Sequence, residues 1–344
     1  MLKIFNYKDT FHLESGKSLP GFHLAYTTLG ELNESKDNAV WVFHALTANS
    51  DASEWWPGLI GHGQLFNPDE HFIICVNMPG SSYGSTSPLD NSEFYHNFPL
   101  FTIKDMVAAY QKLKSFLRID KIHTGIGGSM GGQQLLEWAA TEPDIFEYII
   151  PIATNAVHSP WAIAFNASQR ICIETDETWI EKNEYAGMSG MKAARSIALL
   201  SYRNYETYQA AQSEDDNLVF QDFKSESYQR YQGEKLARRF NAFSYYFLSK
   251  SMDSHNIGRG RRSIQFALKN IRAKTLVIGI SSDILFPYTE QEFLAEHIPG
   301  AELNIIHSNY GHDGFLLEFS QIEYVILNFL KKYSTKNNAA VINR

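Results

Sequence analysis

Short apolar runs recur along the first half of the chain, and their lengths predict strands alternating with helices. The runs at 39–44, 71–76 and 148–152 are rich in β-branched and aromatic side chains, which is typical of buried strands. Between 102 and 117 the apolar residues recur instead at helical spacing. Alternating strands and helices imply an α/β fold with a mostly parallel sheet that is covered by helices on both faces.

A long segment in the second half of the chain breaks this pattern. It contains helical patterns with many Tyr, Arg, Glu and Gln residues and no convincing strand. The strand pattern then returns at 275–280 and 302–306, and an amphipathic helix is predicted at 320–332. The sequence therefore predicts one α/β catalytic core interrupted by a helical lid, with the core at 1–158 and 273–344 and the lid at 159–272.

Composition narrows the class of protein. A hydrophobic content of 44% excludes a disordered chain, and a net charge of −8 argues against a nucleic-acid-binding surface. Cys75 and Cys172 lie far apart in apolar runs, which excludes a disulfide scaffold or a CxxC site. We find no signal peptide, no membrane-spanning run and no metal-ligand spacing. We expect a cytoplasmic protein without a metal and without a permanently bound cofactor.

The strongest chemical motif is a G-x-S-x-G sequence centred on Ser129. It follows a strand-like run at 121–126 and precedes a helical run at 133–140, which is the context of a nucleophile elbow. Glycines flank such a serine because the turn is tight and side chains would clash there. The alternative is a glycine-rich turn in which Ser129 merely caps a helix.

A serine nucleophile needs a general base and a carboxylate that orients the base. In α/β-hydrolases the chain order is serine, acid, histidine. Asp283 follows the strand at 275–280, and His312 follows the strand at 302–306. Both residues are therefore expected at the carboxyl edge of the sheet, although Asp283 alone could equally be a turn residue.

Two backbone N–H groups are the predicted oxyanion hole. The N–H of Met130 follows the nucleophile, and a second donor is expected in the loop after 39–43. Leu46 is the candidate for this second donor, with Ala45 as the neighbouring possibility.

Several longer stretches resemble the homoserine O-acetyltransferase family. The resemblance extends from about residue 20 to residue 330. It rests on these stretches: 26–33, 44–47, 83–86, 127–132, 136–139, 231–235, 251–255 and 311–315.

This resemblance implies an α/β-hydrolase core with a helical lid that also pairs two subunits as a homodimer. It implies acetyl transfer from acetyl-CoA, a co-substrate, to the side-chain hydroxyl of L-homoserine in methionine biosynthesis. By the same resemblance Ser129 is the nucleophile, His312 the base and Asp283 the orienting acid. Arg195 and Tyr202 would face the substrate tunnel, and Asp313 would hold the substrate ammonium.

Other functions stay open at this point. The chain departs from the family pattern at 80–82, 48–50, Asn241 and Asn256. These departures leave two alternatives, which are homoserine O-succinyl transfer and another hydroxy amino acid as the acceptor. A serine esterase would use the same triad without Arg195 or Asp313. On an acidic protein, the anionic CoA also requires a basic rim, for which Arg259, Arg261 and Arg262 are the candidates.

Overall fold

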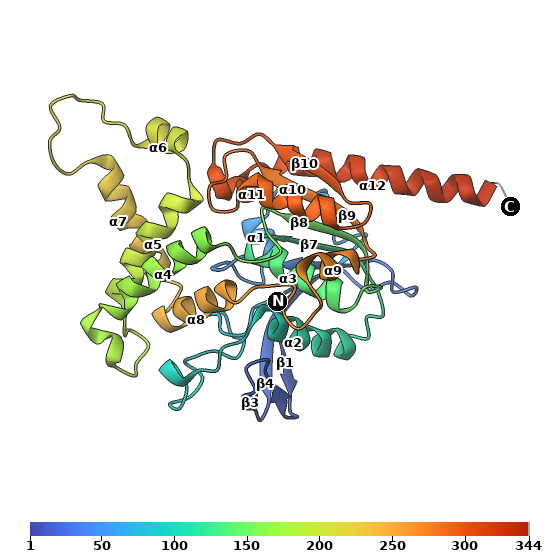
Figure 1. The fold of residues 1–344 in the computed structure, drawn as a ribbon, viewed down its shortest axis with the longest axis horizontal. Coiled ribbons are helices and arrows are strands. Elements are labelled where there is room, and N and C mark those ends of the chain that lie inside the picture. Colours follow the sequence, from blue (N-terminus) through green and yellow to red (C-terminus); the bar gives the residue numbers. More distant parts are fainter. Residues whose placement is uncertain (343–344) are drawn as a thin grey trace.

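The computed structural model describes residues 1–342, and the side chains of residues 1–333. At its centre lies an eight-stranded sheet in the order β1-β4-β6-β5-β7-β8-β9-β10, visible in Figure 1. β4 runs antiparallel to both of its neighbours, and the other pairs are parallel. The strands are β1 Leu2–Tyr7, β4 Phe22–Leu29, β5 Ala39–Phe43, β6 Phe72–Val76, β7 Ile122–Gly128, β8 Phe146–Ile152, β9 Lys274–Ile280 and β10 Glu302–Ile306, with a separate hairpin of β2 Phe11–His12 and β3 Ser18–Leu19.

The predicted α/β fold with a mostly parallel sheet is confirmed. The strands expected from apolar runs correspond to β5 through β10, with bounds that differ by one or two residues. The sequence reasoning missed β1 and β4, which form the antiparallel edge. In β1 only Phe5 is buried, while Leu2 and Ile4 are 53% and 50% exposed, so this edge strand lacks a continuous apolar run.

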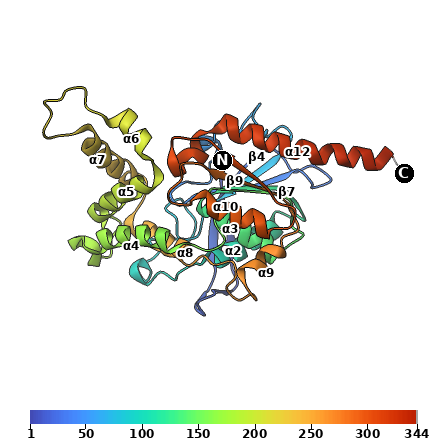
Figure 2. The ribbon, with the colours of Figure 1, turned by 45° about the horizontal axis from the view of Figure 1, so that its top comes forward.

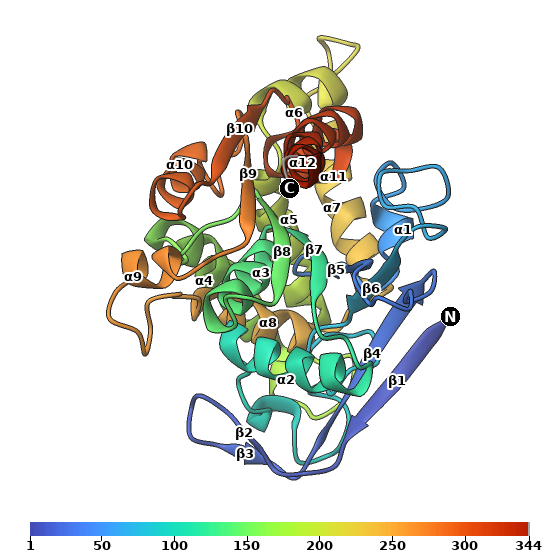
Figure 3. The same ribbon diagram turned by 90° about the vertical axis from the view of Figure 1, so that its right-hand side faces the viewer.

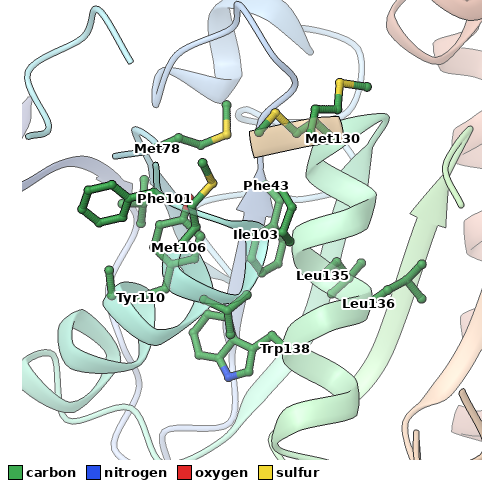
Figure 4. Close-up of a cluster of buried hydrophobic side chains, with 14 of the residues drawn as sticks. Phe43, Met78, Phe101, Ile103, Met106, Tyr110, Met130, Leu135, Leu136 and Trp138 are labelled. Carbon is green, nitrogen blue, oxygen red and sulfur yellow. The ribbon is translucent and has the colours of Figure 1, made fainter. Parts of the chain in front are cut away.

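Alternation along the strands divides the interior into two cores. In β5 the side chains of Trp41 and Phe43 join one core, and those of Val40 and Val42 join the other. The first core packs against α2 and α3, where Tyr110 and the other side chains in Figure 4 form an aromatic and aliphatic cluster. The second core packs against α12 on the opposite face of the sheet, as Figure 3 shows.

Helix α2 begins where the sequence predicts. Thr102 is its N-cap: the Thr102 hydroxyl accepts from the Asp105 N–H, and the Asp105 carboxylate accepts from the Thr102 N–H. The helical runs predicted at 133–140 and 320–332 correspond to α3 and α12, and α12 continues to Ile342. The helices are α1 Ala52–Trp55, α2 Ile103–Phe116, α3 Met130–Thr141, α4 Pro160–Glu174, α5 Met188–Tyr202, α6 Tyr205–Gln212, α7 Lys224–Ala237, α8 Ala242–Asp253, α9 Ile264–Lys269, α10 Tyr288–His297, α11 Gly314–Leu317 and α12 Phe319–Ile342, with 3₁₀ turns η1 Tyr95–Asn97, η2 Glu177–Ile180 and η3 Gly311–Asp313.

Between β8 and β9 the chain is helical and leaves the sheet. Helices α4 to α8 stand beside the sheet as a separate layer in Figures 1 and 2, with α4 packed on α5 and α8, and α5 packed on α7. Helix α9 instead contacts α3 and α10 of the core. The predicted domain boundaries at 158/159 and 272/273 stay a prediction.

The segments that enter and leave this helical layer are bonded to each other. The His158 N–H donates to the His255 carbonyl at 3.0 Å, and the Ile257 N–H donates to the Ala156 carbonyl at 2.9 Å. The chain therefore enters and leaves helices α4 to α8 through one pair of hydrogen-bonded segments, a two-stranded crossing. None of the described helices combines the length and apolar character that a bilayer crossing requires.

Candidate active site

Ser129 occupies the sharp turn between β7 and α3. Its backbone lies at φ 58° and ψ −127°, in the positive-φ region that L-residues rarely adopt. The Ser129 N–H donates to the Ile152 carbonyl at 3.0 Å, so the neighbouring strand β8 helps to hold the turn. This geometry is that of the predicted nucleophile elbow.

The glycines around Ser129 are required by close backbone approaches. A Cβ atom at Gly131 would lie 2.1 Å from the Phe43 carbonyl oxygen, and one at Gly127 would lie 2.7 Å from the Gly131 backbone. Helix α3 can therefore begin directly against the end of β5 only because these side chains are absent.

Asp283 and His312 are brought together as predicted. His312 Nδ1 lies 2.6 Å from Asp283 Oδ2, and both side chains are buried. The other oxygen of Asp283 accepts from the N–H groups of Leu285 and Phe286 at 2.8 and 2.9 Å. The carboxylate is thus fixed from two sides, and it orients the imidazole with Nδ1 as the donor.

The second nitrogen of His312 faces a cavity. Its Nε2 is buried and has no hydrogen-bond partner among the described residues. The imidazole stacks on Phe286, with ring centroids 5.0 Å apart, and contacts the edge of Phe315. Ser129 and His312 line one cavity of about 430 Å³. Because His312 Nε2 has no other partner among the described residues and Ser129 lines the same cavity, this nitrogen is suited to take the proton of the Ser129 hydroxyl.

Of the two predicted oxyanion donors, only Leu46 lines this cavity. Met130 does not line it, but it begins α3 directly after Ser129, which does. His44 fixes the loop after β5 that carries Leu46. Its Nδ1 donates to the Ala45 carbonyl at 2.9 Å, and its Nε2 accepts from the Met78 N–H at 3.1 Å. Burial lowers the pKa of His44 to about 4, which keeps this imidazole neutral. The roles of Leu46 and Met130 stay predictions.

Arg195 and Tyr202 line the same cavity from helix α5 of the lid. The Arg195 guanidinium lies 5.4 Å from the centroid of the Tyr202 ring, and the Tyr202 ring lies 5.8 Å from that of His312. Arg195 Nε is buried without a hydrogen-bond partner among the described residues. A buried guanidinium with a spare donor is suited to a carboxylate ligand.

Asp313 also lines the cavity, beside an arginine that the sequence reasoning missed. Arg203 Nε lies 3.2 Å from Asp313 Oδ2, and Arg203 itself lines the cavity. Burial raises the pKa of Asp313, while the neighbouring Arg203 and Arg195 act to lower it. Nothing in the sequence pairs Arg203 with Asp313, because the two residues lie on different elements 110 positions apart.

A layer of polar groups supports Ser129 from behind. The Thr154 hydroxyl donates to the Ser129 carbonyl at 2.8 Å, and the buried Gln291 side chain donates to the Thr154 carbonyl at 2.6 Å. Ala153, which precedes Thr154, also has a positive φ of 45°. The turn after β8 and the first turn of α10 therefore help to hold the strained serine in place.

Glu290 adds a second carboxyl group behind the triad. Asn155 donates to Glu290 Oε2 at 2.9 Å, and Asn155 in turn accepts from Gln133 of α3 at 2.9 Å. Burial, with a contribution from the nearby charge of Asp283, raises the pKa of Glu290 to about 7. The sequence reasoning did not identify this residue.

The predicted basic rim of Arg259, Arg261 and Arg262 is wrong. None of the three residues lines the cavity. Arg259 pairs with Glu14 at 2.8 Å, and Arg261 pairs with Glu137 at 2.7 Å. The charges of Arg259 and Arg261 are therefore balanced by carboxylates from distant parts of the chain.

Of the departures from the family pattern, the loop at 48–50 lines the cavity through Ala48 and Asn49, whereas residues 80–82, Asn241 and Asn256 do not line it. Asn241 caps α8, accepting from the Ser244 N–H at 2.8 Å, and its side chain donates to Ser82 Oγ at 2.9 Å. The Asn256 side chain accepts from the Gly258 N–H at 2.9 Å. Neither asparagine lines the cavity that holds Ser129 and His312.

The order of the sheet, the strained serine and the Asp–His pair together define an α/β hydrolase. The family model described as alpha/beta hydrolase fold matches residues 38–319. A homoserine O-acetyltransferase of Cyclobacterium marinum is 48% identical over 332 residues, which cover 95% of this chain and 94% of that protein. The chain belongs to the homoserine O-acetyltransferase family.

Two solved structures share the fold. A homoserine O-acetyltransferase from Bacillus anthracis superposes with a TM-score of 0.88 at 23% identity, covering 96% of this chain and 97% of that one. Esterase E22 superposes with a TM-score of 0.87 at 20% identity, covering 96% and 99%. At these identities the likeness concerns the fold alone, and the same fold serves an acetyltransferase and an esterase.

We predict that Thr154→Val weakens the support of Ser129. Valine keeps the shape of threonine but cannot donate to the Ser129 carbonyl, so the free energy of unfolding should fall by about 1 kcal/mol. The burst of p-nitrophenol from p-nitrophenyl acetate should also slow, because the serine turn can relax. Urea unfolding and stopped-flow kinetics measure the two effects. Thr154→Ser, which keeps the hydroxyl, is the control for the burst, and a valine variant as stable and as fast as the parent would contradict the prediction.

We predict that Glu290 makes stability depend on pH. Its pKa is about 7 in the folded chain against 4.5 for the free side chain, so the folded state retains the proton longer. Below pH 4.5 the Glu290 contribution to the free energy of unfolding is fully present. As the pH rises from 4.5 to about 7, up to about 3 kcal/mol of that free energy is lost, and above pH 7 no more is lost.

Glu290→Gln keeps the acceptor for Asn155 but cannot ionise. Relative to the parent, this variant should gain unfolding free energy between pH 5 and pH 8, as measured by urea unfolding at each pH. The matched control is Glu292→Gln, an exposed residue of the same helix. Equal pH dependence in the parent and in Glu290→Gln would refute the assignment.

Proposed function

We propose that this protein transfers an acetyl group from acetyl-CoA to the side-chain hydroxyl of L-homoserine, in methionine biosynthesis. The observation that carries the proposal is a Ser–His–Asp arrangement opening into a cavity whose lid wall is lined by cations, in a chain of the homoserine O-acetyltransferase family. Because an esterase shares this fold, the lid side of the cavity is the feature that would distinguish transfer to homoserine from hydrolysis.

The chemistry proceeds in two acyl-transfer steps. His312 Nε2 takes the proton of Ser129 as Oγ attacks the thioester carbonyl of acetyl-CoA. The C–S bond breaks, and CoA leaves as the thiol with the proton that His312 returns. In the second step His312 deprotonates the homoserine hydroxyl, whose oxygen attacks the acetyl-serine. The ester leaves, and the proton returns to Ser129 Oγ.

The oxyanion of both tetrahedral intermediates would be bound by the N–H groups of Leu46 and Met130. Loss of one such donor typically costs about 3–4 kcal/mol of transition-state stabilisation. The neutral His44 supports this role because it fixes the loop that carries Leu46 without adding a charge beside the oxyanion.

Transfer to homoserine rather than to water requires a site for the amino acid. The zwitterionic backbone of homoserine carries a carboxylate and an ammonium group, and the cavity offers Arg195 for the first and Asp313 for the second. Arg203 would have to share Asp313 with the ammonium group. A plain esterase has no use for these buried charges, since keeping them desolvated is costly.

Other parts of the proposal rest on the family. Succinyl-CoA is the alternative donor, and a serine esterase is the alternative activity. No resident cofactor is proposed, and a cytoplasmic location suits a CoA-dependent pathway. A homodimer formed through the lid is supported by large apolar side chains that the lid exposes, among them Ile180 at 85%, Leu218 at 81% and Phe220 at 81%.

The test of the activity follows CoA thiol release and the acylation state of the protein. We expect acetyl-CoA to release thiol rapidly only when L-homoserine is present, and to do so faster than succinyl-CoA. Intact mass should detect an acetyl adduct, which Ser129→Ala abolishes because the nucleophilic oxygen is gone. Thiol release that homoserine fails to accelerate would identify a hydrolase, and an adduct that persists in Ser129→Ala would exclude this serine.

A second prediction concerns Arg195. Arg195→Gln removes a charged donor from the proposed carboxylate site and should lower kcat/KM for homoserine by about 10- to 100-fold. Arg195→Lys keeps the charge without the guanidinium fork and should recover part of the loss. The acetylation half-reaction, followed by the p-nitrophenol burst, serves as the internal reference. If both half-reactions slowed equally, Arg195 would not be the acceptor-binding residue.

A further inference from the structure

The charges around the cavity differ in sign from the rest of the molecule. The chain carries a net charge of −8, yet the cavity is lined by four cationic side chains, Arg195, Arg203, Lys235 and Arg239, against the two carboxylates Glu54 and Asp313. Arg203 already neutralises Asp313. The cavity is therefore a local positive region on an acidic protein, which concentrates anions near its opening.

Two of these cations form one wall at the end of α7. This α7 wall consists of Gln232, Lys235, Leu236 and Arg239, which line the cavity from the lid. Lys235 is exposed and forms no ion pair with any described residue. Arg239 is held by two neutral oxygens, the Thr47 carbonyl and the Tyr83 hydroxyl, and has no carboxylate partner in the described part of the chain.

The two cations of the α7 wall lack a carboxylate partner. Neither Lys235 nor Arg239 forms an ion pair with a described residue. The adjacent charges of α7 are different: Lys192 pairs with Glu234 at 2.8 Å, and Arg230 pairs with Glu226 at 2.7 Å. Lys235 and Arg239 are thus cations of this end of α7 that line the cavity and whose charge no described carboxylate balances.

We propose that the α7 wall binds the phosphate groups of the acyl donor, with Lys235 as the principal contact and Arg239 as a fixed second charge. This proposal rests on the acetyl-CoA-dependent function proposed above. It places the CoA phosphates against residues other than Arg259, Arg261 and Arg262. The ammonium of Lys235, on a flexible stem at the opening, is suited to a phosphate as a point charge.

The position of the wall separates it from the acceptor site. Tyr202 lies against His312, and Arg195 lies over Tyr202, so these two residues are close to the reacting atoms. Lys235 is exposed to solvent, as expected for a group that meets the part of the donor farthest from the thioester. Arg239 also donates to the carbonyl of Thr47, the residue after Leu46, whose N–H is predicted to bind the oxyanion. Arg239 therefore connects the proposed phosphate site with the oxyanion loop.

The experiment compares a donor with phosphates and a donor without them. Steady-state kinetics with saturating homoserine would use acetyl-CoA and p-nitrophenyl acetate on the full chain. Lys235→Gln should lower kcat/KM for acetyl-CoA about tenfold more than for p-nitrophenyl acetate, mainly through KM, because one charged phosphate contact is lost. Lys235→Arg should restore most of the difference. The matched control, Arg238→Gln, removes an exposed cation that does not line the cavity, and it should leave the ratio of the two donors unchanged.

Three results would overturn the proposal. The first is an equal effect of Lys235→Gln on both donors, and the second is an equal effect of Arg238→Gln and Lys235→Gln on acetyl-CoA. The third is a loss confined to succinyl-CoA, which would mean that Lys235 contacts an acyl carboxylate. Inhibition by adenosine 3′,5′-bisphosphate should weaken in Lys235→Gln in parallel with the rise in KM. Failure of the parent chain to use acetyl-CoA would instead refute the proposed function itself, so the two failures are distinguishable.

Discussion

The backbone of Ser129 must hold a conformation that costs free energy for any residue with a side chain, and much of the core is arranged around that cost. Gly131 allows α3 to begin against the Phe43 carbonyl, and Thr154 with Gln291 secures the turn from behind. Contacts from β5, β8 and α10 therefore hold the serine turn. β5 leads into the oxyanion loop, and α10 follows the segment that carries Asp283, so the nucleophile and its partners are positioned by connected elements.

The fold and the triad could be predicted because their rules are local or topological. Apolar runs mark strands, and the carboxyl ends of parallel strands meet at one edge, which is enough to bring Asp283 and His312 together. The polar contacts between distant segments could not be predicted. Arg203 with Asp313, Gln291 with Thr154 and Arg259 with Glu14 each join residues that the sequence gives no reason to pair. The last of these explains why a basic run was misread as an anion site.

The two faces of the cavity have different origins. The sheet supplies Ser129, His312 and the loop around Leu46, whereas the lid supplies Arg195, Tyr202, Arg203 and the α7 wall. Catalytic groups on the sheet are rigid, since they follow buried strands. The groups that would select among substrates lie on helices packed mainly against each other, and Arg239 is one of the contacts by which the lid reaches the sheet side. A shared hydrolase core can therefore support different acyl acceptors through changes in the lid alone.

The two-stranded crossing at 156–158 and 255–257 has a consequence for how such a chain can change over evolution. The chain segments on either side of helices α4 to α8 are hydrogen-bonded to each other, so the two backbone ends of this helical stretch lie close in space. Insertions are tolerated best where the flanking backbone ends are close in space. The stretch from α4 to α8 is thus the part of the chain where changes in length would disturb the order of the sheet strands and the strained serine least.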